Sequence, residues 1–356
     1  MDIESKLDLI KRVGEEIVTE EELKQLLQTK EHPIAYDGFE PSGNLHIAQG
    51  IMRAINVNKI LKAGCKFKMW IADWFALLNN KMGGDLEKIK LVGKYHVAIW
   101  KACGMETDKI EFLWTSEVIS DKEYWKKVVD VARNTTIKRM IRCSQIMGRS
   151  EKDILSSSQI LYPAMQCADI FHLKADITQL GMDQRKVNIL AREVGPQLGF
   201  WKPVVVSHHM LIGLGEPPKS EGLDRILELK MSKSRTDTAI FMNDSEQEII
   251  RKIQKAYCPA KVLKDNPLLE YSRYLVFEKF EEMEIRRPEK FGGDFVIENY
   301  QELERLYSEG KLHPADLKNS VAYYINEMIK PVRDTIEKDA KLKKLVETIK
   351  GFEITR

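Results

Sequence analysis

The sequence predicts an α/β fold, in which a doubly wound parallel sheet forms the first domain and a mostly α-helical second domain follows. Up to about residue 235, strand-like runs alternate with amphipathic helical stretches. That alternation is typical of right-handed βαβ units around a parallel sheet. Beyond it, helical patterns follow one another with only short extended pieces between them.

The first domain begins with a helical region and continues with five predicted strands. The strands are "PIAYDG", "FKMWIAD", "KIEFLWTS", "ADITQLG" and "KPVVVSHH", at residues 33–38, 67–73, 109–116, 175–181 and 202–209. Helical periodicity covers residues 46–63, 86–103, 121–173 with an interruption near "GRSEKD", and 184–198. Ligands of such sheets bind at the carboxyl ends of the strands, where this sequence places Tyr36, Asp73, Gln184 and His208.

The second domain is predicted from three amphipathic helical segments. They are "DSEQEIIRKIQKAY", "PLLEYSRYLVFEKF" and "VAYYINEMIKPVRDTIEKDAKLKKLVETIK". Because no further βαβ unit follows the fifth strand, we expect one domain over residues 1–239 and a second over residues 240–356.

Composition limits the class of protein. The 356 residues are 43% hydrophobic, enough for two cores, and the net charge of +2 neither requires nor excludes nucleic acid. The five cysteines form no C-x-x-C pair, so we expect neither a disulfide framework nor a structural zinc site. The N-terminus lacks the apolar core of a signal peptide, and no stretch is long enough to span a membrane. We therefore expect a cytoplasmic protein.

The first candidate binding segment is "YDGFEPSGNLHIAQG", at the turn between the first strand and the next helix. Gly38 and Gly43 allow the backbone to pass close to a ligand, and the helix points its N-terminal N–H groups toward an anion. His46 stands at the start of the helix as a donor. A phosphate suits this place, although a tight turn alone explains the glycines equally well.

The second candidate segment is "ELKMSKSRTDTA", at residues 228–239. Lys230, Lys233 and Arg235 lie within six residues, with Ser232 and Ser234 between them. A flexible cationic loop after the last strand can close over a polyphosphate and stabilise charge that develops in a transition state. A solvated basic loop is the alternative interpretation.

The third candidate segment is the helical "QILYPAMQCADIF". Tyr162, Gln166 and Asp169 occupy positions i, i+4 and i+7, which places them on one face. Polar side chains are costly to bury unless they bind something polar. The stripe therefore indicates either a binding site or an ordinary solvated face.

Together these segments resemble a known enzyme family. "PSGNLHIAQ" and "KMSKS" are similar to the two signature motifs of class I aminoacyl-tRNA synthetases, with Ala48 and Gln49 in place of the Gly and second His of the first motif. "AYDGFEPSGNLH", "LYPAMQCADIF" and "GMDQRKVNILARE" resemble the archaeal and eukaryotic type of tyrosyl-tRNA synthetase from about residue 5 to about residue 335. "IADWFALLNNKMGGD" and "RCSQIMGRSE" look most like the plant and protist branch.

The resemblance implies a Rossmann-like catalytic domain that forms tyrosyl-adenylate from tyrosine and ATP with Mg²⁺, and then transfers the tyrosyl group to tRNA(Tyr). It places Tyr36 and Asp169 on the phenol hydroxyl of the substrate. The family also has an aspartate at Asp73, which either contacts the substrate or bonds to a residue of the pocket. For the α-ammonium group it implies Tyr162, Gln166, Gln184 and Glu40. For ATP it implies Gly38, His46, Ala48, Lys230 and Lys233, of which His46, Lys230 and Lys233 take part in catalysis.

The same resemblance implies tRNA contacts and an oligomer. Arg142 and Arg185 match positions near the first base pair of the acceptor stem. Phe291, His313 and Asp316 match positions that grip the first anticodon base, although Asp316 also suits a helix start. A homodimer is implied, joined through an insertion at about residues 115–150.

Two other functions fit parts of the pattern. A tryptophanyl-tRNA synthetase shares the fold, but the pair Tyr36 and Asp169 disfavours it. A catalytically silent tRNA-binding relative is disfavoured by the intact "KMSKS" and by His46.

Overall fold

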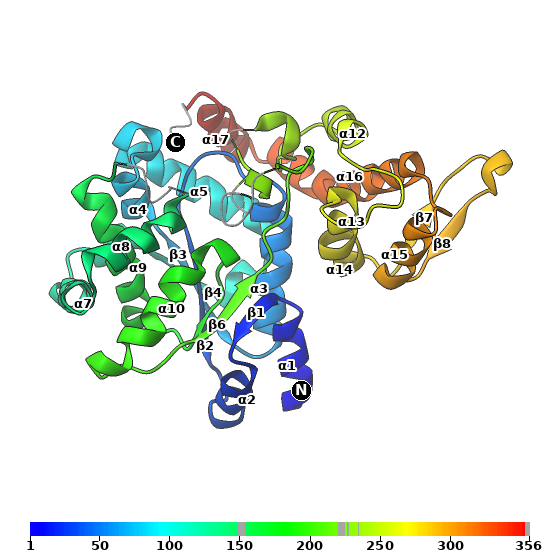
Figure 1. Cartoon of the computed structure of the whole chain (residues 1–356). Coiled ribbons are helices and arrows are strands. Elements are labelled where there is room, and N and C mark those ends of the chain that lie inside the picture. The colour runs from blue at the N-terminus through cyan, green and yellow to red at the C-terminus, as the bar shows by residue number, and fades with distance from the viewer. Residues whose placement is uncertain (149–153, 220–224, 226–227, 234, 353–356) are drawn as a thin grey trace.

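The computed structural model describes residues 1–148, 154–219, 225, 228–233 and 235–352. Within them a six-stranded sheet has the strand order β1-β6-β5-β2-β3-β4 (Figure 1). The strands are β1 Gly14–Val18, β2 Ile34–Phe39, β3 Lys66–Ile71, β4 Ile110–Trp114, β5 Ile177–Thr178 and β6 Val204–His208. Strands β2 to β6 run parallel, as the sequence predicted, although β5 is only two residues long.

The edge strand β1 corrects the sequence-based prediction, which placed residues 14–18 in a helical region. β1 runs antiparallel to β6, with Ile17 opposite Val206, so the sheet is mixed. The adjacent Glu15 and Glu16 give no strong strand signal, and pairing with the valine-rich β6 overrides local propensity.

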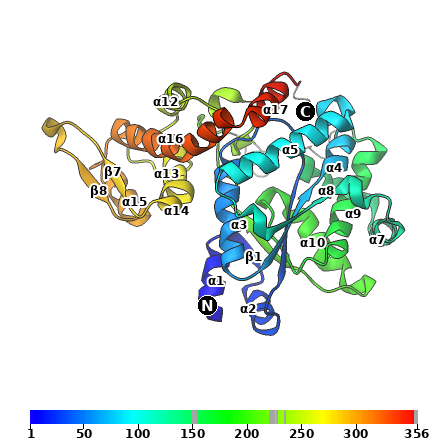
Figure 2. The same cartoon turned by 180° about the vertical axis from the view of Figure 1, so that it is seen from behind.

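Helices cover both faces of the sheet. Alternate residues of the central strands point to opposite faces: Phe39 and Met69 pack on one side, and Tyr36 and Trp70 pack on the other. Helices α3 and α5 cover the first side, and α9 and α10 cover the second (Figures 1 and 2). Their bounds are α3 Arg53–Lys62, α5 Leu86–Ala102, α9 Ser157–His172 and α10 Arg185–Val194.

Two predicted helices are divided in the structure. Residues 121–173 form α7, α8 and α9, and the caps Thr136 and Ser156 begin the second and third of these. The predicted interruption near "GRSEKD" includes residues 149–153, which lie outside the described residues. Residues 46–63 begin with the π-helical turn Ala48–Met52 before α3. The other helices of this part are α1 Ile3–Lys11, α2 Glu20–Thr29, α4 Asp73–Leu78, α6 Thr115–Val118, α7 Lys122–Arg133 and α8 Ile137–Cys143.

The C-terminal part is mostly helical and contains one two-stranded hairpin. Its long helix α16 extends from the hairpin end toward the sheet, and α17 then packs on α5 (Figures 1 and 2). A single apolar cluster runs through both parts and includes Ile99 of α5 and Ile329 of α16. The bounds are α12 Glu246–Lys255, α13 Pro267–Tyr271, α14 Phe277–Lys279, β7 Met283–Ile285, β8 Phe295–Ile297, α15 Tyr300–Ser308, α16 Pro314–Lys338 and α17 Ala340–Lys350.

His209, just after β6, joins three segments. Its ring nitrogens lie 3.0 Å from Glu15 of β1 and 2.9 Å from Glu270 of α13. The ring also stacks on Tyr274 at 4.2 Å between centroids. Burial lowers the pKa of His209, but its hydrogen bonds to the two glutamates outweigh burial and raise the pKa to about 9.

We predict that this contact makes stability depend on pH. The folded protein holds the His209 proton more tightly than the unfolded chain, whose ordinary pKa is about 6.5. The contribution is therefore fully present below about pH 6.5 and is lost as pH rises through about 9, with an upper limit of about 3 kcal/mol. Urea titrations at pH 6.5, 8 and 9.5 measure it.

His209→Gln should flatten this pH dependence, while His32→Gln, at an exposed histidine, should leave it as in the wild type. Parallel curves of unfolding free energy against pH for the wild type and His209→Gln would contradict the assignment.

Candidate active site

A cavity lies at the predicted ligand edge of the sheet. It opens beside the carboxyl ends of β2, β3 and β6 and reaches α9 and the loop at residues 230–231. Sequence segments far apart in the chain meet there because the parallel strands all end at this edge. The predicted site residues that line it are Tyr36, Gly38, Glu40, His46, Ala48, Tyr162, Gln166, Asp169, Gln184 and Lys230.

Asp169 lies beside Tyr36, and both side chains are buried. Its Oδ1 accepts a hydrogen bond of 2.9 Å from the Tyr124 hydroxyl, while Oδ2 has no partner among the described residues. Burial raises the pKa of Asp169 well above its usual range, against the hydrogen bond from Tyr124 and the nearby indole N–H of Trp70, whose Nε1 has no partner of full hydrogen-bonding geometry among the described residues. An unpaired buried oxygen is costly, so this place favours a ligand that supplies a donor.

Tyr124 was not predicted from the sequence. It lies on the buried face of α7 with Val128 and Val131. A tyrosine on an apolar helix face gives no signal that it meets a carboxylate from another helix.

Glu40 is held from three sides. Its carboxylate accepts hydrogen bonds of 3.1 Å from the Tyr162 hydroxyl and of 3.3 Å from the Asn79 amide, and Lys81 lies 3.9 Å away. Burial raises the pKa of Glu40, while the Lys81 charge opposes that change. Asn79 and Lys81 come from the loop after α4 and were not predicted.

The polar stripe on α9 faces inward. Tyr162, Gln166 and Asp169 are all buried, so the interpretation as a solvated face is wrong. The Gln166 amide donates to Gln184 Oε1 at 3.0 Å, and Gln184 in turn donates to the Ile146 carbonyl at 3.0 Å. These bonds fix both amides at the wall of the cavity.

The first signature turn is the segment at residues 36–50, which runs from the end of β2 through the following turn and carries the first signature motif. It approaches the cavity through its backbone. A Cβ on Gly38 would lie 2.9 Å from Tyr36 Oη, and Gly43 has a φ of +101°. His96 Nε2 lies 2.8 Å from the Gly43 carbonyl and secures the turn. His46 is buried, and burial together with the nearby loop lysines lowers its pKa well below the usual range, so it is neutral.

Both lysines of "KMSKS" have partners, and Lys233 reaches this turn. Lys230 donates to Asp183 at 3.0 Å, and Lys233 donates to Ser42 Oγ at 3.1 Å and to the Gly43 carbonyl at 3.4 Å. Lys233 is buried, which lowers its pKa to about 7. The alternative of a solvated basic loop is thus wrong for these two lysines. Ser234 lies outside the described residues.

An ion pair beside the turn was also missed. Arg53, in the first turn of α3, pairs with the fully buried Asp37 of β2. Its guanidinium lies 4.6 Å from the centre of the Phe39 ring. Burial raises the pKa of Asp37 to about 6, although the Arg53 charge opposes this. The available signal was a single arginine between the apolar residues Met52 and Ala54.

Asp73 does not line the cavity, which corrects the expectation of direct contact. Its Oδ1 accepts backbone hydrogen bonds from Trp74 at 2.9 Å and from Ser116 at 3.0 Å. The carboxylate thus holds the start of α4 to the start of α6, directly after β4. His208, by contrast, does line the cavity, and burial lowers its pKa to about 3.

None of the residues predicted to contact tRNA lines the cavity. Arg142 is exposed on α8, whereas Arg185 is paired with Glu16 at 2.6 Å. Phe291 is 60% exposed in the hairpin loop. His313 caps α16 by accepting from the Ala315 amide at 3.1 Å.

The hairpin loop and the start of α16 lie side by side. Arg287 donates to the Gly293 carbonyl at 3.0 Å and to the Lys311 carbonyl at 3.3 Å. These bonds bring the loop that carries Phe291 toward the turn before His313 and Asp316. Asp316 also occupies the first turn of α16, as its alternative role requires.

Across the part of the chain that the structure describes, we find no cluster of three or more histidine, cysteine or acidic side chains able to hold a metal ion. In the same residues, every helix is too short or too polar to cross a membrane.

Comparisons with known proteins agree with the geometry. Residues 28–330 match the family "tRNA synthetases class I (W and Y)". "Tyrosine--tRNA ligase 1, cytoplasmic" of Arabidopsis thaliana is 52% identical, over 100% of this chain and 90% of its own length. Tyrosyl-tRNA synthetase of Pyrococcus horikoshii, solved with L-tyrosine, has a TM-score of 0.90 and 38% identity over 98% of this chain and 100% of its own.

Tryptophanyl-tRNA synthetase of Aeropyrum pernix gives a TM-score of 0.66 and 16% identity, over 95% of this chain and 85% of its own. That likeness shows the fold alone, so the tyrosyl assignment is favoured over the tryptophanyl one. With its Rossmann-like fold, both signature segments at one cavity and a relative identical at half of all positions, the chain belongs to the tyrosine–tRNA ligases, which are class I aminoacyl-tRNA synthetases.

Proposed function

We propose that this enzyme joins L-tyrosine to tRNA(Tyr) in two steps at this cavity. ATP first activates the amino acid as tyrosyl-adenylate, and the tyrosyl group then moves to the 3′ end of the tRNA. The observation that carries the proposal is Asp169 Oδ2, which has no hydrogen-bond partner among the described residues and lies next to Tyr36 in the buried lining of the cavity. It matches an amino acid whose side chain ends in a hydroxyl.

The phenol hydroxyl of tyrosine can both donate and accept. We assign Asp169 Oδ2 as its acceptor and Tyr36 as its donor. The Tyr124 hydroxyl keeps the other carboxylate oxygen in place. Phenylalanine in the same place would leave the Asp169 oxygen buried without a partner, which is the physical basis of selection.

The α-ammonium group of tyrosine needs acceptors, since it carries three donors. Glu40, the Tyr162 hydroxyl and the two linked amides, Gln166 and Gln184, supply oxygens along one wall. Because these groups already bond to one another, the substrate meets an ordered set of side chains at little further cost in conformational entropy.

We assign the ATP site to the signature turn and the "KMSKS" loop. Gly38 and Ala48 leave room for the nucleotide, neutral His46 donates a hydrogen bond, and Lys230 and Lys233 carry positive charge to the phosphates. A carboxylate oxygen of tyrosine attacks the α-phosphorus and forms a new P–O bond. The bond to the bridging oxygen breaks, and pyrophosphate leaves with the electron pair. Mg²⁺ arrives with ATP.

We assign tRNA recognition to both ends of the molecule. Arg142 and Arg185 contact the acceptor stem, and residues 240–356 form the anticodon-binding domain, following the 1–239 catalytic domain. The exposed Phe291 stacks on the first anticodon base, and His313 and Asp316 offer polar contacts to its edge.

A homodimer and a cytoplasmic location complete the proposal. Three large apolar side chains, Val129, Ile137 and Ile154, are at least 60% exposed in and beside the predicted 115–150 insertion. Exposed apolar side chains of this size suit an interface with a second copy of this chain. Residues 149 and 150 of the insertion lie outside the described residues. The Arabidopsis relative is named cytoplasmic, which supports the same location here.

Asp169→Ala should weaken tyrosine binding by roughly 1–3 kcal/mol, the usual cost of leaving a buried hydroxyl without its partner. Discrimination against phenylalanine should collapse, and para-substituted phenylalanines should become substrates, more so with Tyr36→Leu. The measurement is pyrophosphate exchange that depends on each amino acid.

Tyr124→Phe is the matched control, because it removes the hydroxyl that bonds Oδ1 and leaves Oδ2 in place. Its loss of discrimination should be smaller. If Asp169→Ala keeps the wild-type preference for tyrosine, Asp169 does not bind the hydroxyl.

Lys233→Ala should lower the rate of adenylate formation by ~10- to 1000-fold and leave tyrosine binding nearly unchanged. Single-turnover kinetics and equilibrium dialysis measure the two quantities. An unaltered single-turnover rate would remove Lys233 from the mechanism.

The role of Lys233 can also be tested by the pH dependence of the reaction. Because its pKa is about 7 in the free enzyme, its charge is lost as pH rises through that value. We expect kcat/KM for ATP to fall above about pH 7 in the wild type. Lys233→Arg, which stays charged, should show no such fall.

Asp316→Ala should lower kcat/KM for charging by an amount equivalent to about 1–3 kcal/mol, because one base contact is lost. A tRNA with an altered first anticodon base should be less affected by the mutation. Arg142→Ala should weaken charging through the acceptor stem instead. Neither change should slow adenylate formation, and an equal loss there would show a folding defect.

A further inference from the structure

Residues 239–244, just after the "KMSKS" loop, lie against the first signature turn. The Ile47 amide donates to the Ile240 carbonyl at 2.8 Å, and the Met242 amide donates to the Leu45 carbonyl at 3.0 Å. His46 and Phe241 face one another in this bridge. The position of this short segment therefore decides where the loop stands relative to His46.

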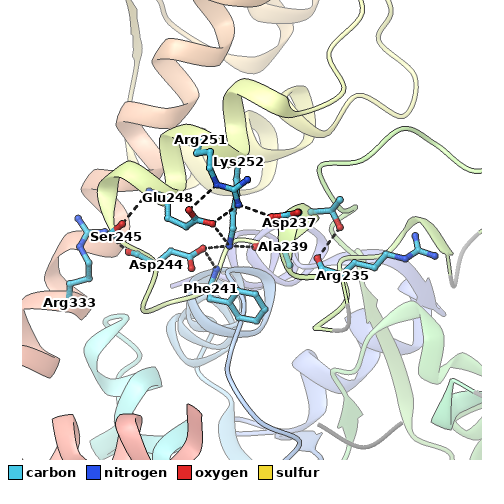
Figure 3. Close-up of polar contacts among 11 residues, drawn as sticks. Arg235, Asp237, Ala239, Phe241, Asp244, Ser245, Glu248, Arg251, Lys252 and Arg333 are labelled. Carbon is cyan, nitrogen blue, oxygen red and sulfur yellow. Dashed lines mark hydrogen bonds and ion pairs between the residues drawn. The ribbon is translucent and has the colours of Figure 1, made fainter. Parts of the chain in front are cut away.

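A buried lysine from the helical part holds that segment. Lys252 of α12 is 4% exposed. Its ammonium donates to the Ala239 carbonyl at 2.9 Å and to Asp244 Oδ2 at 2.6 Å (Figure 3). The same Asp244 oxygen accepts the Phe241 amide at 2.9 Å, and the Lys252 Nζ lies 5.1 Å from the centre of the Phe241 ring.

A buried lysine at position 252 is not needed for packing alone. Burying an ammonium is costly, and an apolar side chain of similar volume often stabilises a protein as well. A cation with directed donors differs from an apolar side chain because it fixes a particular carbonyl and a particular carboxylate. Glu248, at 3.9 Å, adds a second negative charge to the same ammonium.

The contacts of α12 continue into the long helix α16. Arg333 donates to the Asp244 carbonyl at 3.2 Å, so the segment is held from a second helix. An ion pair of 2.7 Å between Arg251 and Asp237 also connects α12 to the residues between the "KMSKS" loop and residues 239–244 (Figure 3).

We propose that Lys252 is a positioning residue for adenylate formation. It fixes the base of the "KMSKS" loop on α12, so that Lys233 meets Ser42 and Gly43 and Lys230 meets Asp183. This inference rests on the proposed role of Lys233, and it links the helical part of the chain to the chemistry at the phosphates.

Lys252→Met keeps an unbranched side chain one atom shorter and removes the charge and the donors. In active-site-titrated enzyme we expect the KM for ATP to rise and the single-turnover adenylation rate to fall ~10- to 100-fold, because small misplacements of catalytic groups cost rate steeply. Tyrosine binding without ATP should stay within about twofold of the wild type, since the tyrosine pocket does not touch this segment. Lys252→Arg should restore part of the rate.

Lys318→Met is the matched control. Lys318 of α16 donates to the Gln254 carbonyl at 2.8 Å and so ties α12 to α16 without touching residues 239–244. Its adenylation should equal that of the wild type. If Lys252→Met does not fold, Asp244→Asn weakens the same contact at constant volume and should raise the KM for ATP in the same way.

The two proposals fail differently. The positioning role alone is overturned if Lys252→Met shows the ATP dependence of the wild type while Lys233→Ala is slow. Where Lys252→Met does not fold, Asp244→Asn takes its place in this comparison. Wild-type rates in Lys233→Ala as well overturn the proposed role of the loop. A loss of tyrosine binding equal to the loss of ATP use shows a general structural defect and also overturns the positioning role.

Discussion

The backbone pairing between residues 45–47 and 240–242 is the constraint on which the rest of the site depends. It brings together two signature segments that are far apart in the chain, at one edge of one sheet. Without it, Lys233 would have no fixed place beside Ser42 and Gly43. The sheet presents the first segment, and the helical part holds the second through Lys252.

Many polar side chains line the cavity, and desolvation sets their pKa values. Burial keeps His46 neutral, lowers the pKa of Lys233 to about 7 and raises that of Asp169. Most polar groups are already paired with one another, as Glu40 is with Tyr162. Asp169 Oδ2 is one of several buried polar atoms without a partner, and its place beside Tyr36 is where a phenol hydroxyl can complete it.

Much of the fold followed from periodicity. Alternation of strand and helix patterns predicted the parallel strands, and the spacing of Tyr162, Gln166 and Asp169 predicted their common face. The edge strand β1 was missed because Glu15 and Glu16 give no strong strand signal, and the pairing partner β6 lies far along the chain. Residues whose role depends on a partner from another element were missed for the same reason.

The sequence by itself determined the fold class, the two signature segments and the family, because local periodicity and motif letters are properties of short windows. Only the tertiary structure showed that Tyr124 holds Asp169, that Arg53 pairs with Asp37, and that Asp73 bonds backbone amides outside the cavity. These contacts join side chains from separate elements. Their strength comes from burial and charge that arise only when the chain is packed, so no window of sequence contains them.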